Sequence, residues 1–327
     1  MTKRIAIAGA GITGLTIATV LARAGHNVTI YDPAGFPAPN ASFKAGGMLA
    51  PYSEIEHMHG DWIAAGMDGI AFWQDFSQNH DIGFHSNGSV LIAHPEDRYI
   101  LDRFVRHLPD NATQEFQPPP ALQKFTHTVF LKDEAHVNPH QTMQALMAQN
   151  DIDYKTENFL FDSTATYDHV IDCRGLGAGD EQAALRGVKG ETLTVRNPDF
   201  TLPCPVRLMH PRYPLYIVPR NDHVFMIGAT VIESDDNTAV SLRSAMELMS
   251  ALYSLHPSFG EAEIIAIEAG IRPAYSDNLP RITMNGNRIT CNGLFRHGYL
   301  LAPVMAYVVK EHISGQKHRY HDLLIKE

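Results

Sequence analysis

The stretch RIAIAGAGITGLTIATVLARAG, residues 4–25, decides the fold of this chain. Residues 4–8 are apolar, as in a buried strand, and residues 15–24 carry apolar side chains at helical spacing. Between them lies the pattern GxGxxG, made by Gly9, Gly11 and Gly14. Gly25 is placed to end the helix. The stretch therefore predicts a strand, a glycine turn and a helix, as in the first half of a Rossmann unit.

Each glycine has a separate physical task in such a turn. Gly9 permits the tight turn out of the strand, Gly11 lets a pyrophosphate approach the backbone, and Gly14 lets helix and strand pack closely. The helix N-terminus then presents free N–H groups and a positive dipole end to the phosphates. A second strand, residues 27–32, ends in Asp32, whose carboxylate can accept hydrogen bonds from ribose hydroxyls. These elements in register indicate an ADP-containing dinucleotide and leave FAD and NAD both open.

Composition limits the class of protein. The chain has 327 residues, enough for one large or two medium domains, and 44% of them are hydrophobic and 19% charged. A net charge of −10 without a long run of like charges argues against a nucleic-acid binder. The three cysteines are too far apart in sequence for a CxxC pair or a disulfide framework: Cys173, Cys204 and Cys291. A reducing cytoplasm suits this cysteine content best.

The N-terminus superficially resembles a secretory signal, because MTKR precedes an apolar segment. Three glycines inside that segment, and a strand that follows it without a break, argue against secretion. The chain has no uninterrupted apolar run of about 18 residues, so we expect no membrane span. The expected localisation is therefore cytoplasmic.

Three further helices are expected from apolar periodicity. They cover residues 68–78, residues 136–149 with Pro139 in the first turn, and residues 240–256. The last of them has an apolar stripe, made by Met246, Met249, Leu252 and Leu255.

The remaining sequence is mostly β-strand and connection. Residues 83–94 are expected to form a hairpin with Asn87-Gly88 at its turn, and residues 117–123 to form a stiff, polyproline-like connection. Further strands are expected at 169–173, 188–196, 213–220, 223–232 and 263–273, the last one entering a loop.

The order of these elements predicts an α/β fold with two domains. A Rossmann-like nucleotide-binding domain would comprise residues 1–80, 134–184 and 270–327. A mainly antiparallel β domain with flanking helices would be inserted into it, comprising residues 81–133 and 185–269, and would bind the substrate.

Seven segments, taken in order, make a family resemblance specific. They are IAGAGITG, KAGGMLAP, HVNP, VKGETL, YIVPRNDHVFMIGAT, GIRPAYSDNLP and GLFRHGYLLAP. In these segments the chain resembles the D-amino-acid-oxidase superfamily of flavoproteins, and within it the glycine oxidases of thiamin biosynthesis. The likeness extends over nearly the whole chain and is faintest between residues 95 and 133. It implies that the nucleotide-binding domain holds FAD.

The resemblance also assigns residues to the cofactor. The implied FAD contacts are Gly9, Gly11, Ile12, Thr13, Gly14, Asp32, Ala41, Ser42, Gly46, Gly47, Met48, Leu294, Phe295, Arg296, His297, Gly298, Tyr299 and Leu300. One further contact is expected from a strand near Phe159 or Leu160. Some relatives attach flavin through a cysteine, but the sequence around Cys291 does not match their attachment segment. We therefore expect non-covalent FAD.

Three residues carry over to the substrate side. Arg272, in GIRP, matches the arginine that binds the substrate carboxylate, and Arg296, in FRHG, matches a second site arginine. Tyr216, in YIVPR, matches the tyrosine over a small substrate pocket. Independently of the resemblance, a carboxylate needs a planar partner with two donors, which arginine provides. Both arginines are expected in loops that follow β segments.

Other polar residues admit plainer explanations. Residues 53–61 contain four side chains that can bind a divalent ion: Glu54, Glu56, His57 and His59. No distant ligand cluster complements them, so we expect a solvated loop and no metal. Lys44 could favour reduced, anionic flavin or point to solvent, and His297 has no explanation as a neighbour of Arg296. Some relatives carry a histidine at the place of Pro214, which leaves specificity on that wall open.

The resemblance implies the oxidation of an amine. Arg272 and Arg296 would fix the carboxylate while the α-carbon of the neutral amine transfers hydride to the flavin, and no side-chain base is required. The expected substrates are oxygen and glycine, sarcosine or a small D-amino acid, and the products are an imine or glyoxylate, ammonia and hydrogen peroxide. The imine would supply the thiazole part of thiamin, which implies a thiazole synthase as pathway partner. The expected assembly is a homo-oligomer.

Two alternatives stay open at this point. One is a dehydrogenase of another small amino acid that passes electrons to a quinone or a partner protein. The other is a flavin-binding protein without turnover.

Overall fold

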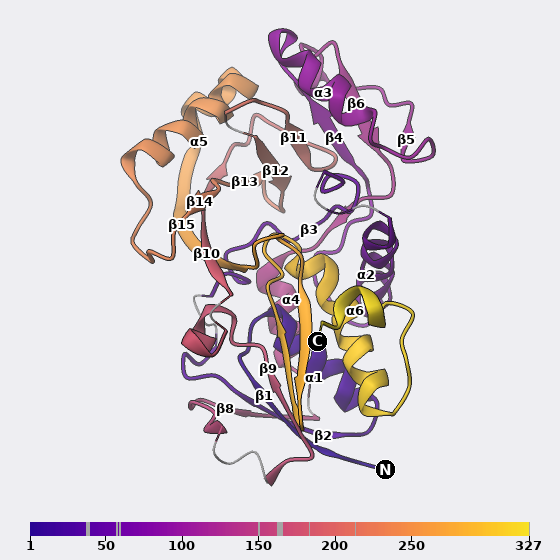
Figure 1. The fold of residues 1–327 in the computed structure, drawn as a ribbon. Helices are drawn as coiled ribbons and strands as arrows, with labels where there is room; N and C mark the ends of the chain where they lie inside the picture. The colour runs from indigo at the N-terminus through magenta and orange to yellow at the C-terminus, as the bar shows by residue number, and fades with distance from the viewer. Residues whose placement is uncertain are drawn as a thin grey trace.

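Two large β-sheets, with helices packed on them, make up the chain in the computed structural model (Figure 1). The structure describes residues 1–36, 40–56, 58, 60–149, 151–161, 166–182, 184–212 and 214–326. Among these residues, no helix is both long enough and apolar enough to cross a membrane.

The first sheet has six strands in the order β16-β17-β9-β1-β2-β8. They are β1 (Arg4–Ala8), β2 (Asn27–Tyr31), β8 (Ile152–Lys155), β9 (His169–Asp172), β16 (Arg281–Asn285) and β17 (Arg288–Asn292). All neighbours are parallel except β16, which pairs with β17 as an antiparallel hairpin. The central strands β1 and β9 are buried beyond their first residues, as their apolar sequences predict.

Five helices accompany this sheet. They are α1 (Ile12–Arg23), α2 (Asp61–Ser77), α4 (Pro139–Met147), α6 (Gly298–Ile313) and the short α7 (His321–Leu324). Helix α1 packs on α6, and both share one apolar core with the strands beneath them. Gly25 ends α1 as predicted, with a φ of 83°. Helix α4 also begins as predicted, because the Asn138 side chain accepts hydrogen bonds from the N–H groups of His140 and Gln141.

The second sheet has nine strands in the order β14-β10-β13-β12-β11-β4-β6-β5, with β15 also paired to β10. They are β4 (Ser89–Ile92), β5 (Thr113–Gln114), β6 (Thr128–Leu131), β10 (Arg186–Arg196), β11 (Val206–Leu208), β12 (Leu215–Pro219), β13 (Val224–Gly228), β14 (Ile232–Glu233) and β15 (Glu263–Ala274). Helices α3 (Arg98–Val105) and α5 (Leu242–Leu255) belong to this part of the chain. Its own apolar cores lie under β4, β11–β13 and α5.

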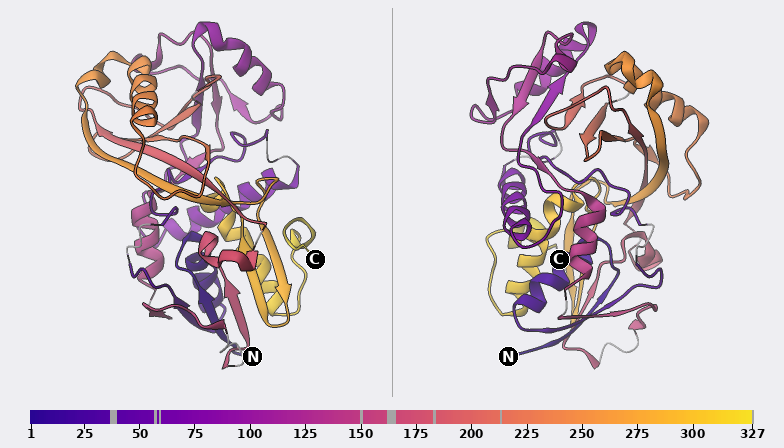
Figure 2. Two further views of the ribbon diagram at one scale, coloured as in Figure 1. Left: turned by 60° about the vertical axis from the view of Figure 1, so that its left-hand side comes forward. Right: turned by 180° about the vertical axis from the view of Figure 1, so that it is seen from behind.

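Short elements complete the fold, and among them the 3-10 helix η4 (Gly175–Gln182) lies between β9 of the first sheet and β10 of the second. Strands β3 (Met48–Leu49) and β7 (Ala135–His136) pair with each other, and further 3-10 helices are η1 (Pro95–Asp97), η2 (Pro120–Leu122) and η5 (Pro257–Glu261). Figure 2 shows the nine-stranded sheet with α5 at one end of the molecule and the six-stranded sheet with α1 and α6 at the other. The long strands β10 and β15 run between these two ends.

Several local predictions were wrong. Helix α2 begins at Asp61, seven residues earlier than expected. Residues 83–94 form no hairpin, because β4 pairs instead with β6 and β11. Met246 is 59% exposed, and Leu248 and Ala251 take its place in the buried stripe of α5. Residues 120–122 form a 3-10 turn within the expected polyproline-like connection.

The domain division stays a prediction, and the sheet membership of each segment can be set beside it. Segments from both ends and the middle of the chain build the six-stranded sheet, and β4–β6 and β10–β15 build the other. Strand β15 continues to Ala274 in the nine-stranded sheet, so the sheet membership favours a boundary after residue 274 over one between 269 and 270.

Candidate active site

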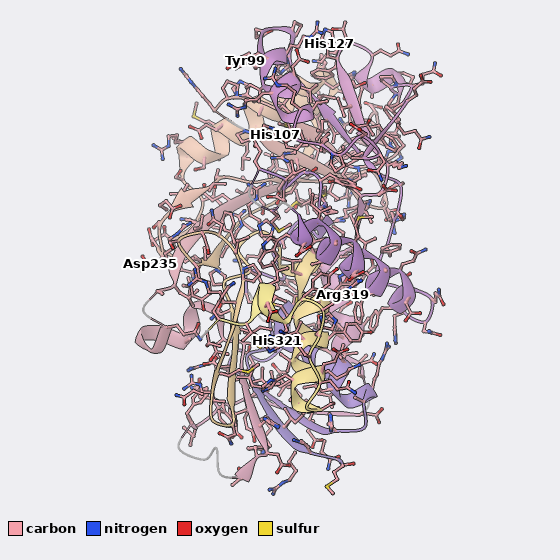
Figure 3. All side chains as sticks on the ribbon, turned by 45° about the vertical axis from the view of Figure 1, so that its right-hand side comes forward. Tyr99, His107, His127, Asp235, Arg319 and His321 are labelled. Atoms are coloured by element: carbon pink, nitrogen blue, oxygen red, sulfur yellow. The ribbon has the colours of Figure 1, made fainter. Side chains whose placement is uncertain are left out.

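A cavity of about 1220 Å³ lies where the two sheets meet. This exceeds the roughly 300–1,000 Å³ of ordinary small-molecule pockets and leaves room for a large ligand with a small one beside it. Its nucleotide end is lined by Gly9, Gly11, Asp32 and Ser42, and its substrate end by Ser53, Glu54, Arg207, Tyr216, Arg272 and Arg296. Exposed residues near β14 also line it, and Asp235 among them lies at the edge of the molecule in Figure 3.

The glycine turn is built as its sequence predicts. Gly9 has a φ of 101°, and a Cβ atom there would lie 2.7 Å from the Cys173 carbonyl oxygen. A Cβ atom on Gly14 would lie 2.0 Å from the Gly9 carbonyl oxygen, so only glycine lets helix α1 approach β1 this closely. A Cβ atom on Gly11 would meet nothing closer than Ser42 Oγ at 3.4 Å. Gly11 therefore leaves space in the cavity that a ligand can fill.

Asp32 and Ser42 position the groups around this turn. Asp32 Oδ2 accepts a hydrogen bond from the Ala10 N–H at 2.8 Å, and Oδ1 accepts one from the Ala34 N–H at 3.0 Å. Each carboxylate oxygen keeps a second lone pair for a ligand hydroxyl. Ser42 Oγ accepts a hydrogen bond from the Ile12 N–H at the start of α1. The turn, the helix N-terminus and the carboxylate together form a cradle for a dinucleotide.

A second glycine pair shapes the middle of the cavity. A Cβ atom on Gly46 would lie 2.7 Å from the Tyr216 ring, and one on Gly47 would lie 2.3 Å from the Val137 carbonyl oxygen. Arg220 fastens this segment by donating hydrogen bonds to the carbonyl oxygens of Gly46 at 2.6 Å and Val137 at 3.0 Å. Burial lowers the pKa of Arg220 to about 10.

Arg272 lies on strand β15 rather than in the predicted loop. Gly190 makes room for it, because a Cβ atom there would lie 2.1 Å from Arg272 Nη2. The guanidinium donates a hydrogen bond to the Thr230 carbonyl oxygen at 3.2 Å. Within the described residues it forms no ion pair, and burial lowers its pKa. A half-buried cation without a carboxylate partner is suited to bind an anionic ligand.

Arg296 differs from Arg272 because it already has a carboxylate partner. It lies in the turn between β17 and α6, and its Nη2 is 2.6 Å from Glu54 Oε1. The two side chains are 24% and 13% exposed. Glu54 stands 242 positions away in sequence, so local patterns could not reveal this pair.

The comparison with known families identifies the fold and the cofactor. The DAO family of FAD dependent oxidoreductases matches residues 4–312. The chain belongs to this family. FAD is therefore its dinucleotide, which decides the choice that the GxGxxG pattern left open and confirms the resemblance seen in the sequence segments.

Two relatives and one solved structure are similar to this chain over nearly its whole length. The ThiO protein of Rhizobium etli, assigned to thiamine biosynthesis as an oxidoreductase, is 41% identical over 97% of this chain and 99% of its own length. A bifunctional ThiO/ThiG protein of Trichormus variabilis is 24% identical over 97% of this chain and 53% of its own length. The crystal structure of glycine oxidase from Geobacillus kaustophilus superposes with a TM-score of 0.86 at 23% identity, covering 100% of this chain and 99% of that one.

Most of the residues that the sequence assigned to FAD line the cavity of this DAO chain. Those that do so are Gly9, Gly11, Ile12, Thr13, Asp32, Ala41, Ser42, Gly46, Gly47, Met48, Leu294, Phe295, Arg296, Gly298 and Tyr299. Three do not: Gly14, His297 and Leu300. Gly14 acts through packing, His297 is a buried residue just before α6, and Leu300 packs on Gly66 and Gly69 of α2.

Two other expectations near the FAD cradle need correction. Asn158 and Phe159 line the cavity from a loop after β8, not from a strand, and Leu160 is 70% exposed. Lys44 does not point freely to solvent, because its Nζ donates to the Ala269 carbonyl oxygen of β15 at 2.7 Å. It lines the cavity, and its influence on reduced flavin stays a prediction. His57 and His59, considered as metal ligands, lie outside the described residues.

Sequence reasoning missed several polar residues around this DAO site. Asp172 is fully buried at the end of β9; burial favours a higher pKa, but hydrogen bonds from Arg174 and Arg288 hold the pKa below its usual value. Glu134 is also fully buried and accepts hydrogen bonds from the Ser53 N–H and from the hydroxyls of Ser53 and Ser89. Burial raises its pKa to about 7. Of these residues only Asp172 had a sequence signal, because a charged residue at the end of an apolar strand is unusual.

Proposed function

We propose that the protein oxidises glycine, and with it sarcosine or small D-amino acids, to the imine. Water then hydrolyses the imine to glyoxylate and ammonia. Bound FAD supplies the chemistry, since it takes two electrons from the amine and passes them to oxygen, which leaves as hydrogen peroxide. The observation that carries this proposal is Arg272, a half-buried guanidinium without a carboxylate partner among the described residues, in the same cavity as the FAD cradle.

The substrate end supports a small amino acid in particular. The Arg272 guanidinium would bind the carboxylate with two parallel hydrogen bonds. Tyr216 lines the same cavity as Arg272, and its ring packs on Gly46, where it narrows the space for a ligand. Arg296 is engaged by Glu54 and therefore contributes its charge at the edge of the site rather than a free pair of donors. These residues orient the α-carbon, and no side chain needs to remove a proton from it.

The relatives support a place for this reaction in thiamin synthesis. One relative is a thiamine biosynthesis oxidoreductase, and another combines ThiO and ThiG in one chain of which this protein matches about half. We therefore infer that the imine is passed to a thiazole synthase, with the two proteins as separate chains or one assembly in the cytoplasm.

A direct assay tests the reaction. Purified yellow protein is mixed with glycine, and oxygen uptake, hydrogen peroxide, ammonia and glyoxylate are measured together. We expect equal amounts of peroxide and ammonia. In a control sample that contains catalase, the peroxide should disappear. If the protein instead reduces an added quinone without oxygen uptake, it is a dehydrogenase. Flavin that stays oxidised with glycine, with sarcosine and with small D-amino acids would indicate a binding protein without turnover.

A further inference from the structure

Arg207, which none of the sequence motifs includes, lines the same cavity as Arg272. Arg207 on β11 stands directly opposite Tyr216 on β12, so the two side chains lie on one face of the sheet. Tyr216 is opposite Gly228 on β13, which is opposite Thr192 on β10, and Thr192 is opposite residue 268 on β15. Arg272 follows four positions later on β15, so its side chain lies on the same face of the sheet. Arg207 and Arg272 therefore flank Tyr216 on the sheet face that lines the cavity.

The contacts of Arg207 leave most of its donors available. It donates one hydrogen bond, to the Ser53 carbonyl oxygen, and its guanidinium lies 5.5 Å from the centre of the Phe104 ring. Among the described residues no carboxylate forms an ion pair with it. A guanidinium has five N–H donors, so one carbonyl oxygen does not saturate it. Leaving such a cation half-buried is unfavourable unless an anion joins it.

The two unpaired arginines line the same cavity although their strands lie apart in the sheet. Burial lowers the pKa of both Arg207 and Arg272, Glu54 raises both pKa values, and Arg296 lowers both. The Glu54–Arg296 pair thus lies within electrostatic range of each of them. The substrate end carries three arginines and one glutamate, and the carboxylate of glycine neutralises only one of the two remaining charges.

Glu134 does not remove this excess. It lies behind Ser53, to which it is hydrogen-bonded, and it does not line the cavity. Its pKa of about 7 means that it is only partly ionised near neutral pH. The substrate end therefore keeps a positive charge that a single carboxylate does not balance.

We propose that Arg207 forms a second anion-binding subsite, which selects amine substrates that carry a second carboxylate. One carboxylate binds Arg272 and the other binds Arg207, with the amine between them beside Tyr216. The class comprises amino acids with a carboxymethyl group on nitrogen and small amino dicarboxylates. The inference rests on the proposed amine oxidation for its chemistry, but the subsite itself is a matter of binding.

Binding to the FAD-loaded protein tests the subsite without turnover. Diglycolate and methoxyacetate share one ether skeleton but carry two and one carboxylates, and neither has an amine to oxidise. Calorimetric titration should show diglycolate binding at least about tenfold tighter than methoxyacetate, because a second charge-assisted contact is added. Arg207→Gln should abolish that difference in affinity, and Arg207→Lys should keep part of it. Arg212 is an exposed residue between β11 and β12, so Arg212→Gln serves as the control and should keep the whole difference.

Equal binding of the two ligands by the unmodified protein would overturn the proposal, and so would a preference for diglycolate that survives in Arg207→Gln. The unmodified protein alone decides the first point, so a variant that fails to fold leaves the proposal testable.

Turnover gives a second, separate readout. The ratio of kcat/KM for iminodiacetate to that for sarcosine, which differ by a carboxylate on the N-substituent, should fall about tenfold or more in Arg207→Gln. An unchanged ratio contradicts the subsite. If no amine is oxidised while diglycolate still binds through Arg207, the proposed function fails and the subsite stands.

Discussion

The two ends of the cavity are built in different ways. At the nucleotide end, the turn from Gly9 to Gly14, the start of α1 and Asp32 come from one short stretch of chain, and much of the surface offered is backbone. At the substrate end, three strands and two turns contribute, and the surface offered is mostly side-chain charge: Glu54, Arg207, Tyr216, Arg272 and Arg296. The first end recognises a ligand by shape and close approach, and the second recognises it by electrostatic complementarity.

The largest effect is expected at the nucleotide end. In Gly14→Ala the new methyl group meets the Gly9 carbonyl oxygen at 2.0 Å, so the turn cannot close and FAD is lost. Gly11→Ala has room within the protein and should weaken only the binding of FAD, by about tenfold or more. The measurements are the FAD content and the unfolding temperature of the FAD-free protein. That temperature should fall in Gly14→Ala alone, and full FAD content in both variants would refute the cradle.

At the substrate end, Arg272→Ala should have the largest effect. Acetate, an inert carboxylate, should bind about 100-fold more weakly, because removing one partner of a desolvated charge pair loses roughly 2–5 kcal/mol. The change in the flavin absorption spectrum reports binding, and FAD content should stay the same. The exposed Arg243→Ala serves as the matched control and should bind acetate normally.

Glu134 should make stability depend on pH. Its pKa is raised from 4.5 to about 7, so the folded state holds the proton more tightly than the unfolded chain does. The stabilisation is present below about pH 4.5 and is lost as pH rises to about 7, on the order of 3 kcal/mol. The free energy of unfolding in urea should show this slope for the unmodified protein and a flatter one for Glu134→Gln. If the free energy of unfolding depended on pH equally in the two proteins, a group other than Glu134 would be responsible.

The smallest effect is expected for the Glu54–Arg296 pair. When both charges are removed in Glu54→Gln with Arg296→Gln, acetate binding should weaken by about tenfold or less. Arg296→Gln alone should be worse, because it leaves the Glu54 carboxylate uncompensated beside the substrate. Acetate titrations of Glu54→Gln, Arg296→Gln and the double variant, with the unmodified protein, form a double-mutant cycle. A double variant as damaged as Arg272→Ala would make Arg296 a direct ligand of the carboxylate.

The same contrast explains what the sequence could predict. Gly9, Gly14 and Asp32 carry out their roles within about one Rossmann unit, so spacing alone located them and their packing. The Asn138 cap of α4 is equally local. The pairing of β4 with β6 and β11 depends on residues up to 116 positions away, and the hairpin predicted from Asn87-Gly88 was therefore wrong.

At the substrate end, family likeness named Arg272 and Arg296 but could not tell them apart. Their difference depends on Glu54, which contacts Arg296 from a turn 242 positions away in the sequence. Arg207 was missed because a single arginine in a strand has no sequence signature, and its meaning depends on the register with Tyr216. Buried Glu134 was missed for the same reason, since its partners Ser53 and Ser89 come from other segments.

Anaerobic mixing with glycine tests the central claim most directly, that Arg272 holds the substrate against FAD. The unmodified protein and Arg272→Ala, with equal FAD content, receive the same glycine concentration, and the absorbance of oxidised flavin is followed. We expect that the unmodified protein loses its yellow colour while Arg272→Ala keeps it. Bleaching of Arg272→Ala as fast and as complete as in the unmodified protein would contradict it.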